Sequence, residues 1–286
     1  MTPPASASSK HPHAPLFVGG LMKSGTTLLR ALISNHPHIF GGLETHWFVD
    51  DFGVPDAAST KRLQEWFDLD DDTLGALLHD VDLLDAECPR NVRMLDVLMR
   101  HLCQRSGKSR WVEKTPGNIF HLDAIFEHHP DAKFFHVIRD PRDVYASWKR
   151  NQKHNVDRFI EDLQRAEASV GARLGHDDER YMEVHYNDLV RDPKGVMTRV
   201  IDFIGEEWVD GIEVNAKDRS EYDRVLAATG KRSTTLESLA QPIFTKSIGQ
   251  YVDILDDDEQ ARIVAAAAHY AEQTGCFATS SSEQAS

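Results

Sequence analysis

The sequence predicts an α/β protein of the P-loop type, in three layers, with a central parallel sheet flanked by helices and a helical insert. Three apolar runs are typical of buried parallel strands: "PLFVGG" at 15–20, "RWVEK" at 110–114 and "KFFHVIR" at 133–139. Helical patterns at 26–35 and 118–129 lie between them. Strands that alternate with helices indicate a parallel sheet covered by helices.

The rest of the chain continues this alternation. The segment 140–151 opens with Asp-Pro, a favourable helix start, and the apolar spacing after it is helical. A further strand is predicted at 180–186, followed by a helix at 192–205. Between residues 50 and 108 the apolar spacing is also helical, and we expect this insert to lie where it can cover a substrate.

The length of 286 residues suits a single large domain, which we place at residues 15–275. Residues 1–14 are rich in Pro, Ser and His and predict a disordered leader without the apolar core of a secretory signal. Residues 276–286 predict a flexible tail. No apolar run is long enough to cross a bilayer, so we expect a cytoplasmic protein without a membrane span.

The cysteines and the net charge argue against several classes of protein. The three cysteines are widely spaced and form no C-x-x-C pair, which argues against a disulfide framework and against a zinc site of the usual spacing. The net charge of −14 disfavours non-specific binding to nucleic acid or anionic membrane. Any site for a polyanion must therefore be small and concentrated.

The stretch "FVGGLMKSGTTLLR" departs from the Walker phosphate loop in one respect. Gly20 and Gly25 keep the Walker spacing, but Thr26 occupies the lysine position and Lys23 lies inside the loop. A Gly-rich turn between a strand and a helix exposes backbone N–H groups at the positive end of the helix dipole. An ordinary tight turn is the alternative, but Lys23, Thr26 and Thr27 together favour a phosphate site.

A second anion site is predicted where the strand at 133–139 ends. A magnesium-dependent NTPase would place an acidic residue at such a strand end, whereas this strand ends in Arg139. The planar guanidinium suits a phosphate dianion, and Ser147 can add a hydroxyl from the following helix. A surface ion pair is the alternative role for Arg139. A ligand with one phosphate in the loop and another held by Arg139 and Ser147, without a metal, resembles an adenosine bisphosphate.

Three segments of the chain resemble motifs of a known family. "MKSGTTLLRALISNHP", "VIRDPRDVYASW" and "VHYNDLVRDP" resemble the 5′-phosphosulfate loop, the 3′-phosphate motif and a Tyr-containing segment of sulfotransferases that use 3′-phosphoadenosine 5′-phosphosulfate (PAPS). The resemblance covers about residues 15–255. It includes "QPIFTKSIGQY" at 241–251, which is similar to a segment of the bacterial, tyrosylprotein-sulfotransferase-like branch.

The resemblance implies metal-free transfer of a sulfuryl group from PAPS to a hydroxyl, or less favourably an amine, with adenosine 3′,5′-bisphosphate as the product. The implied acceptor is a small molecule, a carbohydrate or a peptide. The sequence names neither the acceptor nor the oligomeric state.

The resemblance also implies a set of nucleotide-binding residues. The implied ligands of the 5′ end are Lys23, Ser24, Gly25, Thr26 and Thr27, and those of the 3′-phosphate are Arg139 and Ser147. Tyr186 is expected near the adenine or the 3′-phosphate, and Lys246 and Ser247 are expected to complete the pocket. The family often has "GRW" where this chain has "GQY" at 249–251.

The implied catalytic residues follow from the same comparison. Cytosolic aryl and steroid sulfotransferases use a histidine in a "K-T-H" motif, but Pro116 replaces it here. The tyrosylprotein-like branch places a glutamate just after its second strand, where this chain has Glu44. Glu44 is therefore the implied general base, and a carboxylate at a helix N-terminus is its alternative role.

Two lysines and a histidine complete the expected chemistry. Lys23 is expected to neutralise charge that grows on the bridging oxygen during an in-line transfer. Lys114 is expected to stabilise the moving sulfuryl group, with a surface pair between Glu113 and Lys114 as its alternative. His46 is expected either to contact the acceptor and act as a spare base, or to face solvent.

Two other functions stay open on the sequence. The chain can be read as an ATP-dependent P-loop kinase, which would require Mg²⁺, or as a catalytically inactive nucleotide-binding protein. Retention of Lys23, Glu44 and Lys114 argues against the inactive protein.

Overall fold

The computed structural model describes most of the chain: residues 14–48, 64–84, 90–151, 155–171, 178–215 and 234–277, with the isolated positions 61, 173, 174, 223 and 227. The leader expected before Ala14, the tail from residue 278 onward and parts of the 50–108 insert lie outside the described residues.

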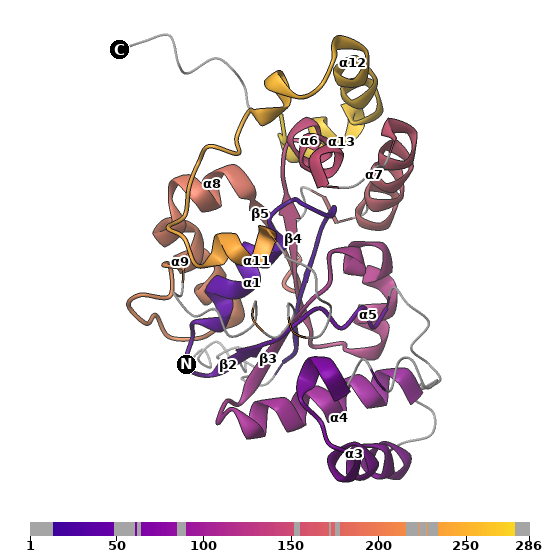
Figure 1. The fold of residues 1–286 in the computed structure, drawn as a ribbon, viewed down its shortest axis with the longest axis vertical. Coiled ribbons are helices and arrows are strands. Elements are labelled where there is room, and N and C mark those ends of the chain that lie inside the picture. Colours follow the sequence, from indigo (N-terminus) through magenta and orange to yellow (C-terminus); the bar gives the residue numbers. More distant parts are fainter. Residues whose placement is uncertain are drawn as a thin grey trace, which may run out of the picture.

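The centre of the molecule is a parallel sheet of five strands in the order β2-β3-β1-β4-β5 (Figure 1). The strands are β1 Leu16–Gly19, β2 Ile39–Gly41, β3 Arg110–Lys114, β4 Lys133–Ile138 and β5 Tyr181–His185. The predicted strands correspond to β1, β3, β4 and β5, so the predicted fold class is confirmed. The short strand β2 was not predicted from its own residues.

Helices cover both faces of this sheet (Figure 1). One face carries α1 Thr26–Ser34, α8 Tyr186–Arg191 and α9 Pro193–Ile204. The other carries α4 Arg90–Arg105, η1 Pro116–His121, α5 Leu122–His128 and α7 Val156–Val170. Further helices within the described ranges are α3 Asp71–Leu83, α6 Pro141–Asn151, α11 Thr234–Leu239, η2 Gln250–Asp253, α12 Asp257–Ala266 and α13 Ala268–Thr274.

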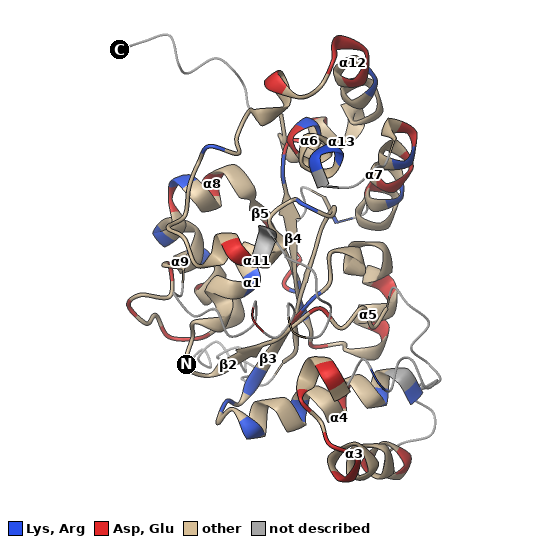
Figure 2. Ribbon diagram, viewed as in Figure 1, with Lys and Arg blue, Asp and Glu red and all other residues tan. Residues whose placement is uncertain are grey.

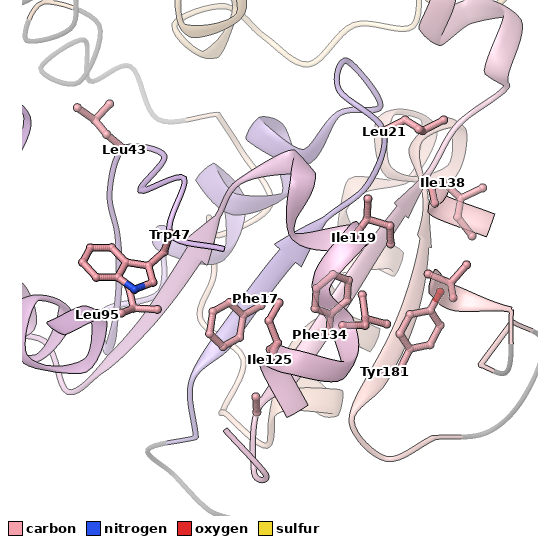
Figure 3. Close-up of a cluster of buried hydrophobic side chains, with 14 of the residues drawn as sticks. Phe17, Leu21, Leu43, Trp47, Leu95, Ile119, Ile125, Phe134, Ile138 and Tyr181 are labelled. Atoms are coloured by element: carbon pink, nitrogen blue, oxygen red, sulfur yellow. The ribbon is translucent and has the colours of Figure 1, made fainter. Parts of the chain in front are cut away.

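Strands β1 and β4 are largely apolar on both faces because both faces are buried. In β4, Phe135 and Val137 pack with α1 and α9, whereas Phe134 and Ile138 belong to the cluster on the opposite face. Figure 3 shows this opposite cluster, where Phe134 lies near Ile119 of η1. Since successive side chains of a strand point to opposite faces, a doubly covered strand reads as a continuous apolar run.

Helix starts follow the local sequence. The Asp140 carboxylate accepts the backbone N–H of Arg142 at 2.9 Å, and α6 begins at Pro141 as predicted. Asp192 accepts the N–H of Gly195 at 2.9 Å in the same way, and α9 ends before Gly205, whose φ is 73°. A capping carboxylate satisfies N–H groups that have no partner within the helix.

The helical insert is part of the core. Helix α4 connects β2 to β3, and it buries Leu95 and Leu98 in the cluster on its face of the sheet. Helix α3 packs against α4 and buries Leu77. The predicted helices are therefore present, and α4 acts as the crossover helix that a parallel sheet requires.

Candidate active site

Each of the five strands delivers a predicted site residue to the same edge of the sheet. These residues are Lys23 after β1, Glu44 three positions after β2, Lys114 at the end of β3, Arg139 directly after β4 and Tyr186 directly after β5. All five line one cavity of about 1160 Å³. In open parallel sheets, ligands bind beyond the carboxyl ends of the strands, so this cavity is where a substrate is expected.

The other predicted residues lie around the same cavity. Its lining includes Gly25, Thr26, Thr27, His46, Ser147, Lys246 and Ser247. Ser24 does not line the cavity, because its side chain is buried within the loop after β1. From the described part of the 50–108 insert, Trp66 lines the cavity.

The loop between β1 and α1 has a backbone shape that favours glycine. Gly25 has a φ of 110°, and a Cβ there would lie 2.4 Å from the ring of Tyr186. A Cβ at Gly20 would lie 2.6 Å from the carbonyl oxygen of Val137. Both positions therefore exclude a side chain. Lys23 adopts a φ of 76°, a left-handed conformation that is unusual for a residue with a Cβ.

Arg139 joins this loop to the C-terminal part of the chain. Its guanidinium donates to the carbonyl oxygens of Lys23 at 2.9 Å and Ser247 at 2.6 Å, and its Cζ lies 4.4 Å from the ring centroid of Tyr186. The Tyr186 hydroxyl and Ser247 Oγ are 2.7 Å apart. Burial lowers the pKa of Arg139, but an arginine stays cationic at physiological pH. A surface ion pair, the alternative role for Arg139, is wrong.

The buried atoms Arg139 Nε and Ser24 Oγ have no hydrogen-bond partner within the described ranges. An unsatisfied buried donor costs about 1–3 kcal/mol, so an anion that accepts from Arg139 Nε would recover part of that cost. The residues present therefore fit an anionic ligand.

The segment 246–251 is held against α6 by Asp143. Its carboxylate accepts the backbone N–H groups of Gly249 at 2.9 Å and Tyr251 at 3.2 Å. The Tyr251 ring packs under the guanidinium of Arg142, 4.0 Å from Cζ to centroid. Sequence analysis did not assign this tethering role to Asp143, because its partners lie more than a hundred residues away. The tether keeps Ser247 beside Arg139.

Glu44 lies in the loop after β2 and is paired. Lys114 Nζ donates to Glu44 Oε1 and, at 3.0 Å, to Thr27 Oγ1, and His46 Nε2 lies 3.3 Å from Glu44 Oε2. Burial alone would raise the pKa of the Glu44 carboxyl, but Lys114 and the hydrogen bond from His46 outweigh it and hold this pKa well below its ordinary value. Glu44 is a third exposed, so a ligand in the cavity can reach it.

Burial and local structure exclude the alternative roles of Lys114 and Glu44. Glu113 and Lys114 are 1% and 2% exposed, so a surface pair is wrong. His46 is half-buried beside Glu44. Glu44 lies in an irregular segment and does not start a helix.

The electrostatics of the cavity differ from those of the surface. Burial lowers the pKa of the Lys23 ammonium, Glu44 raises it and Lys114 lowers it further, with a net lowering. The lining has twice as many basic as acidic side chains: Lys23, Arg30, Lys114, Arg139, Arg150 and Lys246 against Glu44, Asp162 and Asp253. Acidic side chains instead occupy outer helices such as α3 and α12 (Figure 2). The cavity is thus a concentrated basic site on an acidic protein.

A separate group of His and Glu side chains lies at the opposite edge of the sheet. His36, His38 and Glu206 have possible metal-ligand atoms within 4.8 Å of one another. However, His36 Nδ1 accepts the N–H of His38, so Nε2 carries the proton and donates to the Glu207 carbonyl at 3.0 Å. Glu206 already pairs with Arg110 at 3.1 Å. These bonds favour a structural role for the group.

The fold and this cavity define an α/β protein of the P-loop type, in which the first strand-to-helix turn lines a basic cavity. The chain belongs to the sulfotransferase family, whose model matches residues 15–210. Among the described residues, no helix combines the length and the apolar character needed to span a membrane.

Individual relatives agree with this assignment. The chain is 22% identical over 254 residues to "Protein-tyrosine sulfotransferase 1" of Danio rerio, covering 86% of this chain and 67% of that protein. Other curated relatives are longer, so the chain spans about half to two thirds of their length.

Solved structures agree at the level of the fold. The sulfotransferase domain of the Synechococcus PCC 7002 olefin synthase superposes with a TM-score of 0.58 at 23% identity, over 93% of this chain and 97% of that one. Mouse sulfotransferase SULT7A1 complexed with PAP superposes with a TM-score of 0.51 at 13% identity, over 92% and 86% of the two chains.

Proposed function

We propose that this chain transfers a sulfuryl group from PAPS to a hydroxyl, or less favourably an amine, with Glu44 as the general base. The observation that carries the proposal is that a single basic cavity contains the β1–α1 loop, the buried Arg139 and the Glu44–Lys114 pair. Membership of the family supports sulfuryl transfer. The neighbour complexed with PAP supports a donor of this nucleotide type.

The two anion sites match the two ends of the donor. The loop after β1 offers the hydroxyls of Thr26 and Thr27 and the start of α1 to the phosphosulfate. Arg139, with its unsatisfied Nε, and Ser147 face the 3′-phosphate. The cavity volume exceeds the roughly 300–1,000 Å³ of ordinary ligand sites, which leaves room for an acceptor beside the donor.

The chemistry assigned to the side chains is proton removal and charge neutralisation. When bound, PAPS supplies a sulfuryl group whose bond to the bridging phosphate oxygen breaks, and that oxygen keeps the electron pair. Glu44 takes the proton of the acceptor hydroxyl while the acceptor oxygen bonds to sulfur. Lys23 neutralises charge on the bridging oxygen, and Lys114 neutralises charge on the sulfuryl oxygens.

The ion pair between Glu44 and Lys114 links these two roles. A carboxylate held by an ammonium group is a weak base, because its pKa is lowered. A donor anion beside Thr27 would attract Lys114, which donates to both Thr27 and Glu44. Glu44 would then lose a partner and gain proton affinity, so the base becomes effective only after the donor has bound.

The acceptor is inferred only by class. Relatives that bear the name protein-tyrosine sulfotransferase favour a peptide hydroxyl over a carbohydrate or another small molecule. The half-buried His46 beside Glu44 lies where such an acceptor would be contacted.

The decisive experiment is a transfer assay with radiolabelled PAPS and excess EDTA. Tyrosine-containing peptides and host-cell extract serve as acceptors, and mass spectrometry identifies the product. We expect labelled sulfated product without metal, and inhibition by adenosine 3′,5′-bisphosphate. Phosphoryl transfer from ATP that requires Mg²⁺ would indicate a kinase instead, and tight nucleotide binding without any transfer would indicate an inactive protein.

A further inference from the structure

The buried carboxylate of Glu113, next to Lys114, accepts four hydrogen bonds. Glu113 Oε1 accepts from the backbone N–H of Thr45 at 3.2 Å, the Thr45 hydroxyl at 2.8 Å and the Thr115 hydroxyl at 2.8 Å. Its other oxygen accepts from Asn118 Nδ2 at 2.5 Å. Glu113 is 1% exposed, so solvent does not compete for these bonds.

These bonds fix three successive backbone N–H groups. The N–H of Thr45 donates to Glu113 directly, that of His46 donates to Thr115 Oγ1 at 3.0 Å, and that of Trp47 donates to Thr45 Oγ1 at 3.3 Å. Each hydroxyl gives its single proton to Glu113, so its lone pairs stay available to the N–H group. One carboxylate therefore orients the whole segment 45–47.

The segment needs such a tether because the sheet does not hold it. The pairing of β2 with β3 ends at Gly41 and Val112, before Glu44 is reached. His46 also has a φ of 55°, a left-handed conformation that a residue with a Cβ adopts only when its surroundings impose it. Through this turn, the His46 and Glu44 side chains come within 3.3 Å of each other.

We propose that Glu113 is a positioning residue that holds Glu44 in place opposite Lys114 through the segment 45–47. Two consecutive residues at the end of β3 then set both members of the ion pair. Lys114 contributes its own ammonium group, and Glu113 fixes the loop that carries the carboxylate. The inference rests on the proposed function, in which Glu44 removes the acceptor proton.

The test compares Glu113→Ala with Glu113→Gln. Gln keeps an oxygen that can accept from Thr45 and Thr115, and its new NH₂ group faces Asn118. Asn118 Oδ1 has no hydrogen-bond partner among the residues that the structure describes. If the side-chain amide of Asn118 turns over, its Oδ1 can accept from the new NH₂ group. We therefore expect Glu113→Gln to keep the kcat and the ordered segment 45–47 that Glu113→Ala loses.

The readouts separate positioning from general structural damage. We expect Glu113→Ala to lower kcat about 10- to 100-fold, as expected for a displaced catalytic group, with the Kd for adenosine 3′,5′-bisphosphate within about threefold of wild type. Amide hydrogen exchange at residues 45–47 should become faster. Thr115→Val removes the hydroxyl that joins Glu113 to the His46 N–H but keeps the bonds between Glu113 and Thr45. It should act in the same direction, and it decides the question if Glu113→Ala does not fold.

Glu206→Ala is the matched control, since it removes a partly buried carboxylate bound to Arg110 at the opposite edge of the sheet. It should leave kcat and exchange at 45–47 unchanged. Unchanged exchange at 45–47 in both Glu113→Ala and Thr115→Val, or equal losses of kcat and nucleotide affinity, would overturn the proposal. If wild type fails to transfer sulfuryl from PAPS while Glu113→Ala still releases 45–47, the tether stands and the proposed function fails.

Discussion

The two ends of the cavity are built differently. At the proposed nucleotide end, Arg139 is held by carbonyl oxygens, and its Nε and the Ser24 hydroxyl lack hydrogen-bond partners in the described chain. At the other end, the Glu44 carboxylate already has Lys114 and His46 as partners. An anion can therefore enter the nucleotide end without displacing a side-chain ion pair, whereas the pairing of Glu44 with Lys114 and His46 lowers the pKa of its carboxyl.

The difference extends to how the residues are supported. Arg139 and Tyr186 directly follow strands, so the sheet sets their positions. Glu44 belongs to an irregular segment whose position depends on the side chain of Glu113. If the nucleotide end is preformed and the segment that carries Glu44 is adjustable, the donor would bind before Glu44 acts as a base.

The largest expected effect tests the base end. Glu44→Gln should lower kcat by about 10²–10⁴-fold, because a positioned base is lost, and should leave the Kd for adenosine 3′,5′-bisphosphate within about threefold. Steady-state kinetics gives kcat, and calorimetry gives the Kd. His46→Asn is the control for a spare base. Near-normal turnover in Glu44→Gln, with a large loss in His46→Asn, would transfer the base role to His46.

The next effect tests the nucleotide end. Arg139→Ala should weaken PAPS binding about 10- to 100-fold, because a charge-assisted contact to the 3′-phosphate is lost. Binding of adenosine 5′-phosphosulfate, which lacks that phosphate, should weaken far less. Calorimetric titration of both ligands decides the assignment, with Arg180→Ala at the far end of β5 as a charge-matched control. Equal losses for both ligands would contradict it.

The smallest effect concerns stability and pH. Because the pKa of Glu44 is lowered in the fold, its ionised form stabilises the protein. This contribution is complete above the unfolded-state pKa of about 4.3 and is lost as the pH falls through the lower folded-state pKa. Since Glu44 is a third exposed, we expect Glu44→Gln to cost only about 1 kcal/mol at pH 7, or about 2–4 °C in Tm.

Thermal unfolding between pH 7 and pH 3.5 measures this difference. The difference in stability between wild type and Glu44→Gln should shrink below about pH 4. A difference that grows on acidification would show that the pKa of Glu44 is raised rather than lowered.

Sequence patterns predicted the sheet better than the loops between its strands. A strand buried on both faces, such as β4, can be recognised in the sequence as an apolar run. Strand β2 has only three residues and ends in Gly41, so it gives no such run. Helix α7 was not predicted, although its Asn155 cap and the spacing of its apolar residues carry the necessary signal. That miss came from the interpretation and not from the sequence.

The residues around the site divide in the same way. A resemblance in short motifs was enough to name a set of site residues, and all of them except Ser24 line one cavity. The bonds between Glu113 and Thr45 join positions 68 residues apart, and nothing in "EKTPGN" or "LETHW" indicates their meeting. Contacts of this kind depend on the register of the sheet, which only the folded chain defines.

Lys23 makes two demands on a single position. Its left-handed backbone favours a residue without a Cβ, while its proposed chemistry needs an amine on a long side chain. Exchange to glycine would relax the loop and delete the ammonium in one step. A substitution that relaxes the backbone at this residue therefore removes the ammonium group, and a residue that keeps the ammonium group keeps the backbone strain.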